Sequence, residues 1–287
     1  MAAKTEAKDA LSSVEHTALG MFAGVVEVTC TMPMVSIKNA LQSNRSIPLS
    51  PRELYRGWLV NAIGIAPITG VSFGVNRLLQ KTLAPGVEQS EMGLGLQMFC
   101  PTVAGVAAGL VCGPSELVMI QQQQRKQTLA AQAKQIYQQY GVLAFGRGLG
   151  PTFVREGLYS WGYLGLCPLV REQLANTPVL KDYPTSAYIA GGMASGVVAC
   201  AATHPFDTVK TRMQANMDKK ATPEYKSMPS TFMHVYREKG FFQGLYSGFL
   251  PRTGRLMVAV VILSGVKDKL VELVTDHRES AAKSTDM

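Results

Sequence analysis

Residues 203–214 read THPFDTVKTRMQ and directly follow the apolar run AYIAGGMASGVVACAA at 187–202. This composition predicts a membrane-spanning helix that ends in a proline, an aspartate, a lysine and an arginine. A charged side chain at the centre of a bilayer costs about 3 kcal/mol or more unless it has a partner, and it marks a pathway for polar solutes. We therefore expect the charges of this stretch to be paired with other parts of the chain.

The same pattern recurs twice upstream, which predicts a threefold internal repeat. Each of three prolines has a glycine nine residues before it and a glutamine nine residues after it. These triplets are Gly24, Pro33 and Gln42; Gly105, Pro114 and Gln123; and Gly196, Pro205 and Gln214. Each unit then passes through a short motif into a second apolar segment, so three units of two helices give six. The motifs are LYRG at 54–57, GRG at 146–148 and LYSG at 245–248.

The predicted fold is an all-α membrane protein with six transmembrane helices in three two-helix repeats around a central cavity. Each predicted span is long enough to cross a hydrocarbon core of about 30 Å. The spans are 17–41, 58–80, 96–123, 149–174, 186–214 and 249–273. The linkers at 125–141 and 216–240 predict short amphipathic surface helices, whereas the proline-rich linker at 43–53 does not. The domains are an N-terminal tail 1–16, repeats 17–85, 86–180 and 181–275, and a C-terminal tail 276–287.

Composition narrows the functional classes. Charged residues make up 17% of the chain and apolar residues 47%, which is typical of helices that are apolar outside and polar inside. The net charge of +8 is scattered and forms no long basic run, so we expect no nucleic-acid partner. It fits an anionic substrate or acidic lipid headgroups. No catalytic motif or metal-spaced cluster is present, so we expect no enzyme and no metal site.

The motif Pro-x-acid-x-x-base-x-base in HPFDTVKTRMQ resembles the signature of the mitochondrial carrier family. Pro205, Asp207, Lys210 and Arg212 match it fully, and the resemblance covers residues 17–275. It implies residence in the mitochondrial inner membrane, termini on the cytosolic side, and one substrate site that opens alternately to either side. It also implies bound cardiolipin at the matrix-side helix ends and no other cofactor.

The resemblance implies a matrix gate in which the acid of one odd-numbered helix pairs with the base of the next. Carried over, Glu116 meets Lys210 and Asp207 meets Lys38. We expect the kinks at Pro33, Pro114 and Pro205 to bring these charges to the central axis.

The third matrix pair falls on Val35 and Met119, and both residues are apolar. Replacing both partners of a buried ion pair is neutral in many proteins, whereas replacing one strands a charge. The gate is therefore altered and not simply broken. The alternative is that PMVSIK and PSELVM are decayed signatures in a protein that no longer gates.

The cytosolic gate of the family has only a weak counterpart here. By register from Pro67, the acid and base positions are Arg77 and Gln80, Pro168 and Arg171, and Asp268 and Val271. Of these, only Asp268 with Gln80 makes a polar link.

The family's substrate contacts fall on the even-numbered helices, at Gly64 and Ile65, Arg155 and Glu156, and Arg255. An arginine followed by an acid goes with amino-acid substrates in similar carriers, since a guanidinium binds a carboxylate and a carboxylate binds an ammonium. The alternative is that Arg155 and Glu156 solvate one another or lie near the lipid headgroups.

Glu27 lies six residues before Pro33, inside the first span. It is predicted either to bind a cationic group or a proton in the cavity, or to be the structural partner of a neighbouring helix. The two interpretations stay open.

The function expected from these features is a solute carrier of the inner mitochondrial membrane that moves an amino acid or related small carboxylate, by exchange, through alternating access. The alternative is a carrier-like subunit or scaffold of a larger inner-membrane complex with little or no transport.

Overall fold

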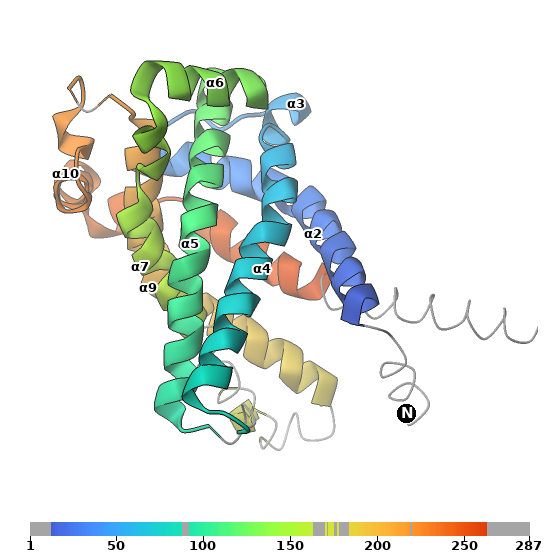
Figure 1. The fold of residues 1–287 in the computed structure, drawn as a ribbon. Helices are drawn as coiled ribbons and strands as arrows, with labels where there is room; N and C mark the ends of the chain where they lie inside the picture. The colour runs from blue at the N-terminus through green and yellow to red at the C-terminus, as the bar shows by residue number, and fades with distance from the viewer. Residues whose placement is uncertain are drawn as a thin grey trace, which may run out of the picture.

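The structure is a computed structural model, and every regular element that it describes is a helix (Figure 1). The described residues are 13–87, 92–162, 170, 172–174, 177, 184–218 and 220–262.

Long helices alternate with short ones in the order that the repeats predict. Repeat 1 holds α2 (Ser13–Gln42), α3 (Pro51–Leu54) and α4 (Trp58–Leu83). Repeat 2 holds α5 (Leu94–Arg125), α6 (Leu129–Tyr140), the 3₁₀ turn η1 (Val142–Gly146) and α7 (Leu149–Ser160). Repeat 3 holds α9 (Pro184–Ala215), η3 (Pro223–Tyr225), α10 (Met228–Gly240), the π-helical turn η4 (Phe241–Leu245) and helical residues 249–262.

Each predicted span overlaps a helix of the structure, but the ends differ. The fourth span, predicted at 149–174, is described as the α-helix Leu149–Ser160 and again as helical at residues 170 and 172–174, and the sixth is described to residue 262. The surface helices predicted in the second and third linkers are α6 and α10, whereas the proline-rich first linker forms only the four residues of α3. The tail 276–287 and most of 1–16 lie outside the described residues.

The three signature prolines lie inside their helices and not at the ends. Pro33, Pro114 and Pro205 are interior to α2, α5 and α9. A proline removes one backbone hydrogen bond and crowds the preceding turn, so it bends a helix that continues past it. Figure 1 shows α2 changing direction part-way along its length.

The three repeats close into a ring through equivalent contacts at the short motifs. Arg56 of repeat 1 donates to the carbonyl of Gln127 at 3.4 Å, just past the end of α5. Arg147 of repeat 2 donates to the carbonyl of Met213 at 2.6 Å, in the last turn of α9. Ser247 of repeat 3 donates to the carbonyl of Leu41 at 3.0 Å, in the last turn of α2. Each repeat therefore contacts the C-terminal end of the first long helix of the next repeat. Repeat 3 contacts α2 of repeat 1, which closes the ring.

The glycine of each motif permits this close approach. Gly148 has a φ of +81°, and a Cβ placed on it would lie 3.0 Å from Cγ of Gln214 on α9. The glycines of the other two motifs, Gly57 and Gly248, also have positive φ. Gly57 lies against α5, and Gly248 lies against α2. A side chain at such a position is strained by its backbone and also crowds the helix junction.

We expect Gly148→Ala to destabilise the protein more than Gly86→Ala. Gly86 has a nearly equal φ of +78° but no atom within 4 Å of a Cβ placed there, so it isolates the backbone cost of about 1 kcal/mol. The contact with Gln214 should add about 1 kcal/mol at Gly148. Melting temperatures in detergent measure the difference, and equal losses in the two variants would show that the contact is unimportant.

The polarity of the molecule is arranged as the composition predicts. Many interior side chains are polar, including Thr31, Ser36, Asn39, Gln42, Gln121, Gln123, His204, Asp207, Lys210 and Gln214. Many exposed side chains on the long helices are apolar, including Phe22, Ile63, Phe73, Leu78, Phe99, Leu110, Val198 and Val261. A polar interior and an apolar surface fit helices that face lipid and enclose a polar pathway.

Two stretches, Pro51–Leu83 and Leu94–Arg125, are long and apolar enough to cross a membrane on length and composition alone, among the residues that the structure describes. This is fewer than the six spans predicted. The first long helices of repeats 1 and 3, α2 and α9, carry buried ionisable groups, and such groups lower the mean hydropathy of a helix. The six-span arrangement therefore stays a prediction.

Candidate gate and binding site

Charged side chains from α2, α5, α7, α9 and residues 249–262 meet at the centre of the ring. Both ion pairs predicted from the signature are in contact there. Lys38 Nζ lies 2.9 Å from Asp207 Oδ2, and Lys210 Nζ lies 2.5 Å from Glu116 Oε2. Lys210 and Asp207 are almost fully buried, so neither charge has water as an alternative partner. These pairs join α2 to α9 and α5 to α9.

The third contact, between α2 and α5, is uncharged. Val35 and Met119 lie together in a buried apolar cluster with Met32 and Val60. Directly beyond this cluster the side chains of the two helices are hydrogen-bonded.

A pair of amides makes this α2–α5 link. Asn39 Nδ2 donates to Gln123 Oε1 at 2.9 Å, and Gln123 Nε2 donates to Ser36 Oγ at 3.2 Å and to the Arg56 carbonyl at 3.1 Å. Sequence reasoning missed Asn39, whereas the position of Gln123 nine residues after Pro114 was a usable signal. The apolar pair therefore sits beside a neutral polar link and leaves no unpaired charge.

Asp207 is the centre of the cluster. Besides Lys38, it accepts a hydrogen bond from Gln42 Nε2 at 3.0 Å, and Arg252 Nη1 lies 3.9 Å from Oδ2. Arg252 also donates to Thr203 Oγ1 at 2.8 Å. Sequence reasoning missed Arg252, although it precedes Arg255 by three residues and so shares its helix face.

Arg155 lies within the gate cluster. Its Nη2 is 2.9 Å from Glu116 Oε2 and contacts Glu156 Oε1, and its Nε is 3.7 Å from Asp207 Oδ1. Cys112 Sγ lies 3.4 Å from the same Nη2. Arg155 and Glu156 therefore do pair, as the alternative to the substrate interpretation requires, but Arg155 also contacts acids of two other helices.

Glu27 and Arg255 form a pair that the sequence did not predict. Arg255 Nη2 is 3.3 Å from Glu27 Oε1, which also accepts a hydrogen bond from Thr31 Oγ1 at 3.0 Å. Glu27 is buried, while the side chain of Arg255 is 38% exposed. Glu27 therefore has a partner on a neighbouring helix, which agrees with its structural interpretation. Part of the Arg255 side chain remains exposed.

Gly64 and Ile65 lie at helix contacts. Gly64 is buried against Ser115 of α5 and Ile68, and Ile65 packs 3.3 Å from the position of a Cβ on Gly24 of α2. Both residues therefore join α4 to its neighbours, and neither offers a charged group.

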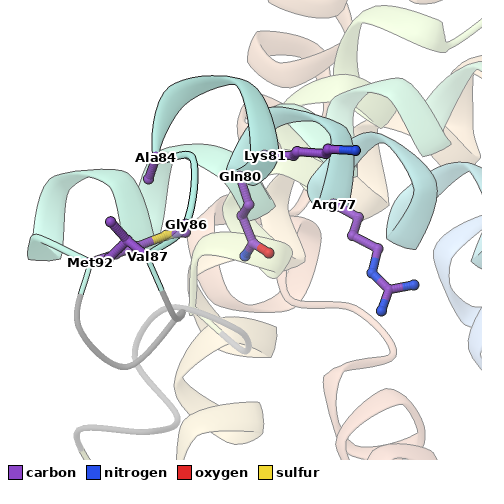
Figure 2. A pocket seen from close by; sticks show the side chains of 7 residues that line it. All are labelled: Arg77, Gln80, Lys81, Ala84, Gly86, Val87 and Met92. Atoms are coloured by element: carbon purple, nitrogen blue, oxygen red, sulfur yellow. The ribbon is translucent and has the colours of Figure 1, made fainter.

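The predicted cytosolic gate is described only in part. Arg171 and Asp268 lie outside the described residues, so the Gln80–Asp268 link is untested. Gln80 lines a cavity of about 450 Å³ at the end of α4 together with Arg77 and Lys81 (Figure 2). The charged ends of Arg77 and Lys81 point in different directions in Figure 2.

The ring of repeats and the paired signature charges agree with comparison to known proteins. The family profile described as mitochondrial carrier protein matches residues 90–177 and 181–278, which is more than half of the chain. The chain belongs to the mitochondrial carrier family. The first matched range lies in repeat 2, and the second covers repeat 3 and ends three residues after it. Members of this family are transporters, and the chain is a multi-pass protein of the mitochondrial inner membrane.

Curated relatives carry several substrate names. A calcium-binding mitochondrial carrier protein, SCaMC-2, of Xenopus tropicalis is 29% identical over 281 residues, covering 89% of this chain and 53% of the relative. The mitochondrial 2-oxodicarboxylate carrier 1 of Saccharomyces cerevisiae is 30% identical over 226 residues, covering 75% of this chain and 71% of the relative. The human mitochondrial adenyl nucleotide antiporter SLC25A25 is 28% identical over 281 residues, covering 89% of this chain and 58% of the relative. The chain thus spans about half the length of the calcium-binding carrier and more of the 2-oxodicarboxylate carrier.

Proposed function

We propose that this carrier exchanges a small organic carboxylate, an amino acid or a related acid, across the inner mitochondrial membrane. Transport proceeds by alternating access, through six spanning helices in three repeats around a central cavity. The ion pairs between the proline-bent ends of α2, α5 and α9 form the gate on the matrix side.

The observation that carries this proposal is a set of arginines with unused donors at the centre of the ring. Arg155 Nε, Arg252 Nη1 and Arg255 Nε are buried and have no hydrogen-bond partner among the described residues. The first two face Asp207 at 3.7 and 3.9 Å, which is beyond hydrogen-bond length. A guanidinium binds a carboxylate through two parallel N–H bonds, so these donors suit an organic acid.

The charges of the cluster also favour an anion. Among the described residues, five cations face four carboxylates. The cations are Lys38, Arg155, Lys210, Arg252 and Arg255, and the carboxylates are Glu27, Glu116, Glu156 and Asp207. One bound carboxylate that carries no ammonium group balances the cluster. A zwitterionic amino acid adds no net charge, and Glu156 supplies an acceptor for its ammonium.

The relatives named for 2-oxodicarboxylates and for adenyl nucleotides define the competing substrates. Gly64 and Ile65 provide no charge for a polyphosphate, which favours the smaller acids. A second carboxylate on the substrate would use the exposed side of Arg255.

Counter-exchange in proteoliposomes tests the proposal. Vesicles holding the purified chain are preloaded with amino acids, 2-oxodicarboxylates or nucleotides, and uptake of the labelled solute is followed. We expect saturable exchange of a small carboxylate that falls at least about tenfold in Arg255→Ala. The matched control Arg52→Ala removes an exposed arginine and should exchange normally.

Failure of the folded protein to exchange any of these solutes would contradict transport. It would favour the alternative, a carrier-like subunit of a larger inner-membrane complex. Co-purification of a stable complex from mitochondria would then be the measurement to make.

Bound cardiolipin is a further part of the proposal. The basic chain and the matrix-side helix ends suit an acidic headgroup. Mass spectrometry of lipids that remain with the purified protein tests it.

A further inference from the structure

We infer that Glu27 selects 2-amino acids over 2-oxo acids, because it accepts the ammonium of a substrate whose carboxylate binds the adjacent Arg255. This inference rests on the proposed exchange of small carboxylates, and it narrows the substrate class to zwitterionic acids. The feature that carries it is the ion pair between the two side chains, in which Arg255 Nη2 lies 3.3 Å from Glu27 Oε1.

The threefold repeat indicates that the ring can pack without this ion pair. The residues equivalent to Glu27, six positions before the signature proline, are the buried Ala108 and Ala199. The residues equivalent to Arg255, seven positions after the motif glycine, are Gly64 and Arg155. Where repeat 1 meets repeat 2 and where repeat 2 meets repeat 3, an alanine therefore takes the place of the acid. Packing of the helices does not require a carboxylate at this point, so Glu27 is a departure from the repeat that needs another reason.

Arg255 is the most accessible of the three central arginines with an unused donor. Its side chain is 38% exposed, whereas those of Arg155 and Arg252 are 13% and 11% exposed. Its Nε has no hydrogen-bond partner among the described residues. A substrate carboxylate that enters the ring therefore meets both accessible surface and a free N–H group at Arg255.

Glu27 keeps one carboxylate oxygen for a further donor. Its Oε1 accepts hydrogen bonds from Thr31 Oγ1 at 3.0 Å and from Arg255 Nη2. In the part of the chain that the structure describes, no hydrogen bond or ion pair engages Oε2. The side chain of Glu27 is only 9% exposed, so water solvates this oxygen poorly. An ammonium group that reaches Oε2 supplies the missing donor.

A zwitterionic substrate satisfies both members of the ion pair. Its carboxylate binds Arg255 and its ammonium binds Glu27, so every charge keeps a partner of opposite sign. A 2-oxo acid offers the same carboxylate but no ammonium. It draws Arg255 away from Glu27 and places two carboxylates together with a single cation, which disfavours its binding.

Glu156 is the other acceptor for an ammonium in the cluster, but it stands beside a different arginine. It contacts Arg155 Nη2, which also lies 2.9 Å from Glu116 Oε2. The ammonium and the carboxylate of a 2-amino acid are attached to the same carbon, so the acid that recognises one must adjoin the arginine that binds the other. Because Arg255 is the more accessible arginine, the selection falls to Glu27.

Counter-exchange of matched acids tests this assignment. Each amino acid of the panel is compared with the 2-oxo acid of the same carbon skeleton, and the maximal rate divided by KM is measured for both. We expect the unmodified protein to favour the amino acid by at least about tenfold. In Glu27→Gln this ratio should fall at least about tenfold, through a loss for the amino acid and a gain for the 2-oxo acid. In Glu156→Gln the ratio should stay unchanged.

Two further measurements keep the test decisive if Glu27→Gln folds poorly. Glu27→Ala copies the residue that repeats 2 and 3 carry at this position, and it should lower the ratio in the same way. In the unmodified protein in detergent, the amino acid should raise the melting temperature more than its 2-oxo acid does. A purely structural role of Glu27 would lower exchange of both acids alike and would leave the ratio unchanged.

The outcomes separate this inference from the proposed function. If the unmodified protein exchanges carboxylates without preferring the amino acid, or if the ratio responds to Glu156→Gln and not to the Glu27 variants, the role of Glu27 is wrong and the carrier function stands. If the unmodified, folded protein exchanges no carboxylate, the proposed function is wrong and the inference is overturned with it.

Discussion

Replacing Asp207 with alanine should abolish exchange and lower the free energy of unfolding by about 3–5 kcal/mol. Asp207 has no exposed surface, and Lys38 lies 2.9 Å from it. Lys210, Arg155 and Arg252 approach it at 3.6, 3.7 and 3.9 Å. Removing Asp207 leaves buried cations of several helices without their shared carboxylate. Their excess positive charge is then neither paired nor solvated by water.

Thermal unfolding in detergent and counter-exchange in vesicles measure the two effects. Glu53→Ala is the matched control, because Glu53 forms an ion pair with Lys126 whose side chain is 62% exposed. An exposed pair contributes about 1 kcal/mol or less. Asp207→Ala melting at the temperature of the control would contradict the central role of Asp207.

The second large effect is expected where the third gate pair is apolar. Val35→Asp alone or Met119→Lys alone places an unpaired charge in the cluster with Met32 and Val60, at a cost of about 3–5 kcal/mol each. The double substitution creates an ion pair between α2 and α5. It should recover about 2 kcal/mol relative to the sum of the single changes.

The restored pair should also slow exchange. The closed gate would then have three charged links, and the α2–α5 ion pair would add to the hydrogen bond between Asn39 and Gln123. A double-mutant cycle of melting temperatures and exchange rates measures both effects. The uncharged pair Val35→Asn with Met119→Gln is the control, and strictly additive losses in the charged cycle would mean that the two positions do not meet.

This asymmetry bears on how the gate works. Two of the three junctions of the ring are held by ion pairs, and one is held by neutral amides and apolar packing. The amide link joins the two helices without burying a charge, so it avoids the desolvation cost of an ion pair. Among the described residues, Asn39 Oδ1 has no hydrogen-bond partner. The absence of the signature at Val35 and Met119 is thus compatible with a closed gate, which weakens the interpretation of decay.

The sequence by itself determined the repeat and the signature pairs. The spacing of Pro33, Pro114 and Pro205 from their glycines and glutamines places equivalent residues at equivalent points of three helices. Once three such helices close into a ring, the acid of one must face the base of the next, as Asp207 and Lys38 do. The amphipathic pattern of two linkers predicted α6 and α10, because their apolar residues recur at helical spacing.

Only the tertiary structure decided which further side chains join the cluster. Arg155 and Glu116 are 39 residues apart, and Arg255 and Glu27 are 228 residues apart. No repeat relation connects either pair, because each joins the first long helix of a repeat to a second long helix. The crossing of the helices and the reach of a long guanidinium decide such contacts, and local sequence specifies neither of them. The contact between Arg155 and Glu116 is therefore a property of the packed ring, whereas the spacing of the chain already predicts the pairs Lys38–Asp207 and Lys210–Glu116.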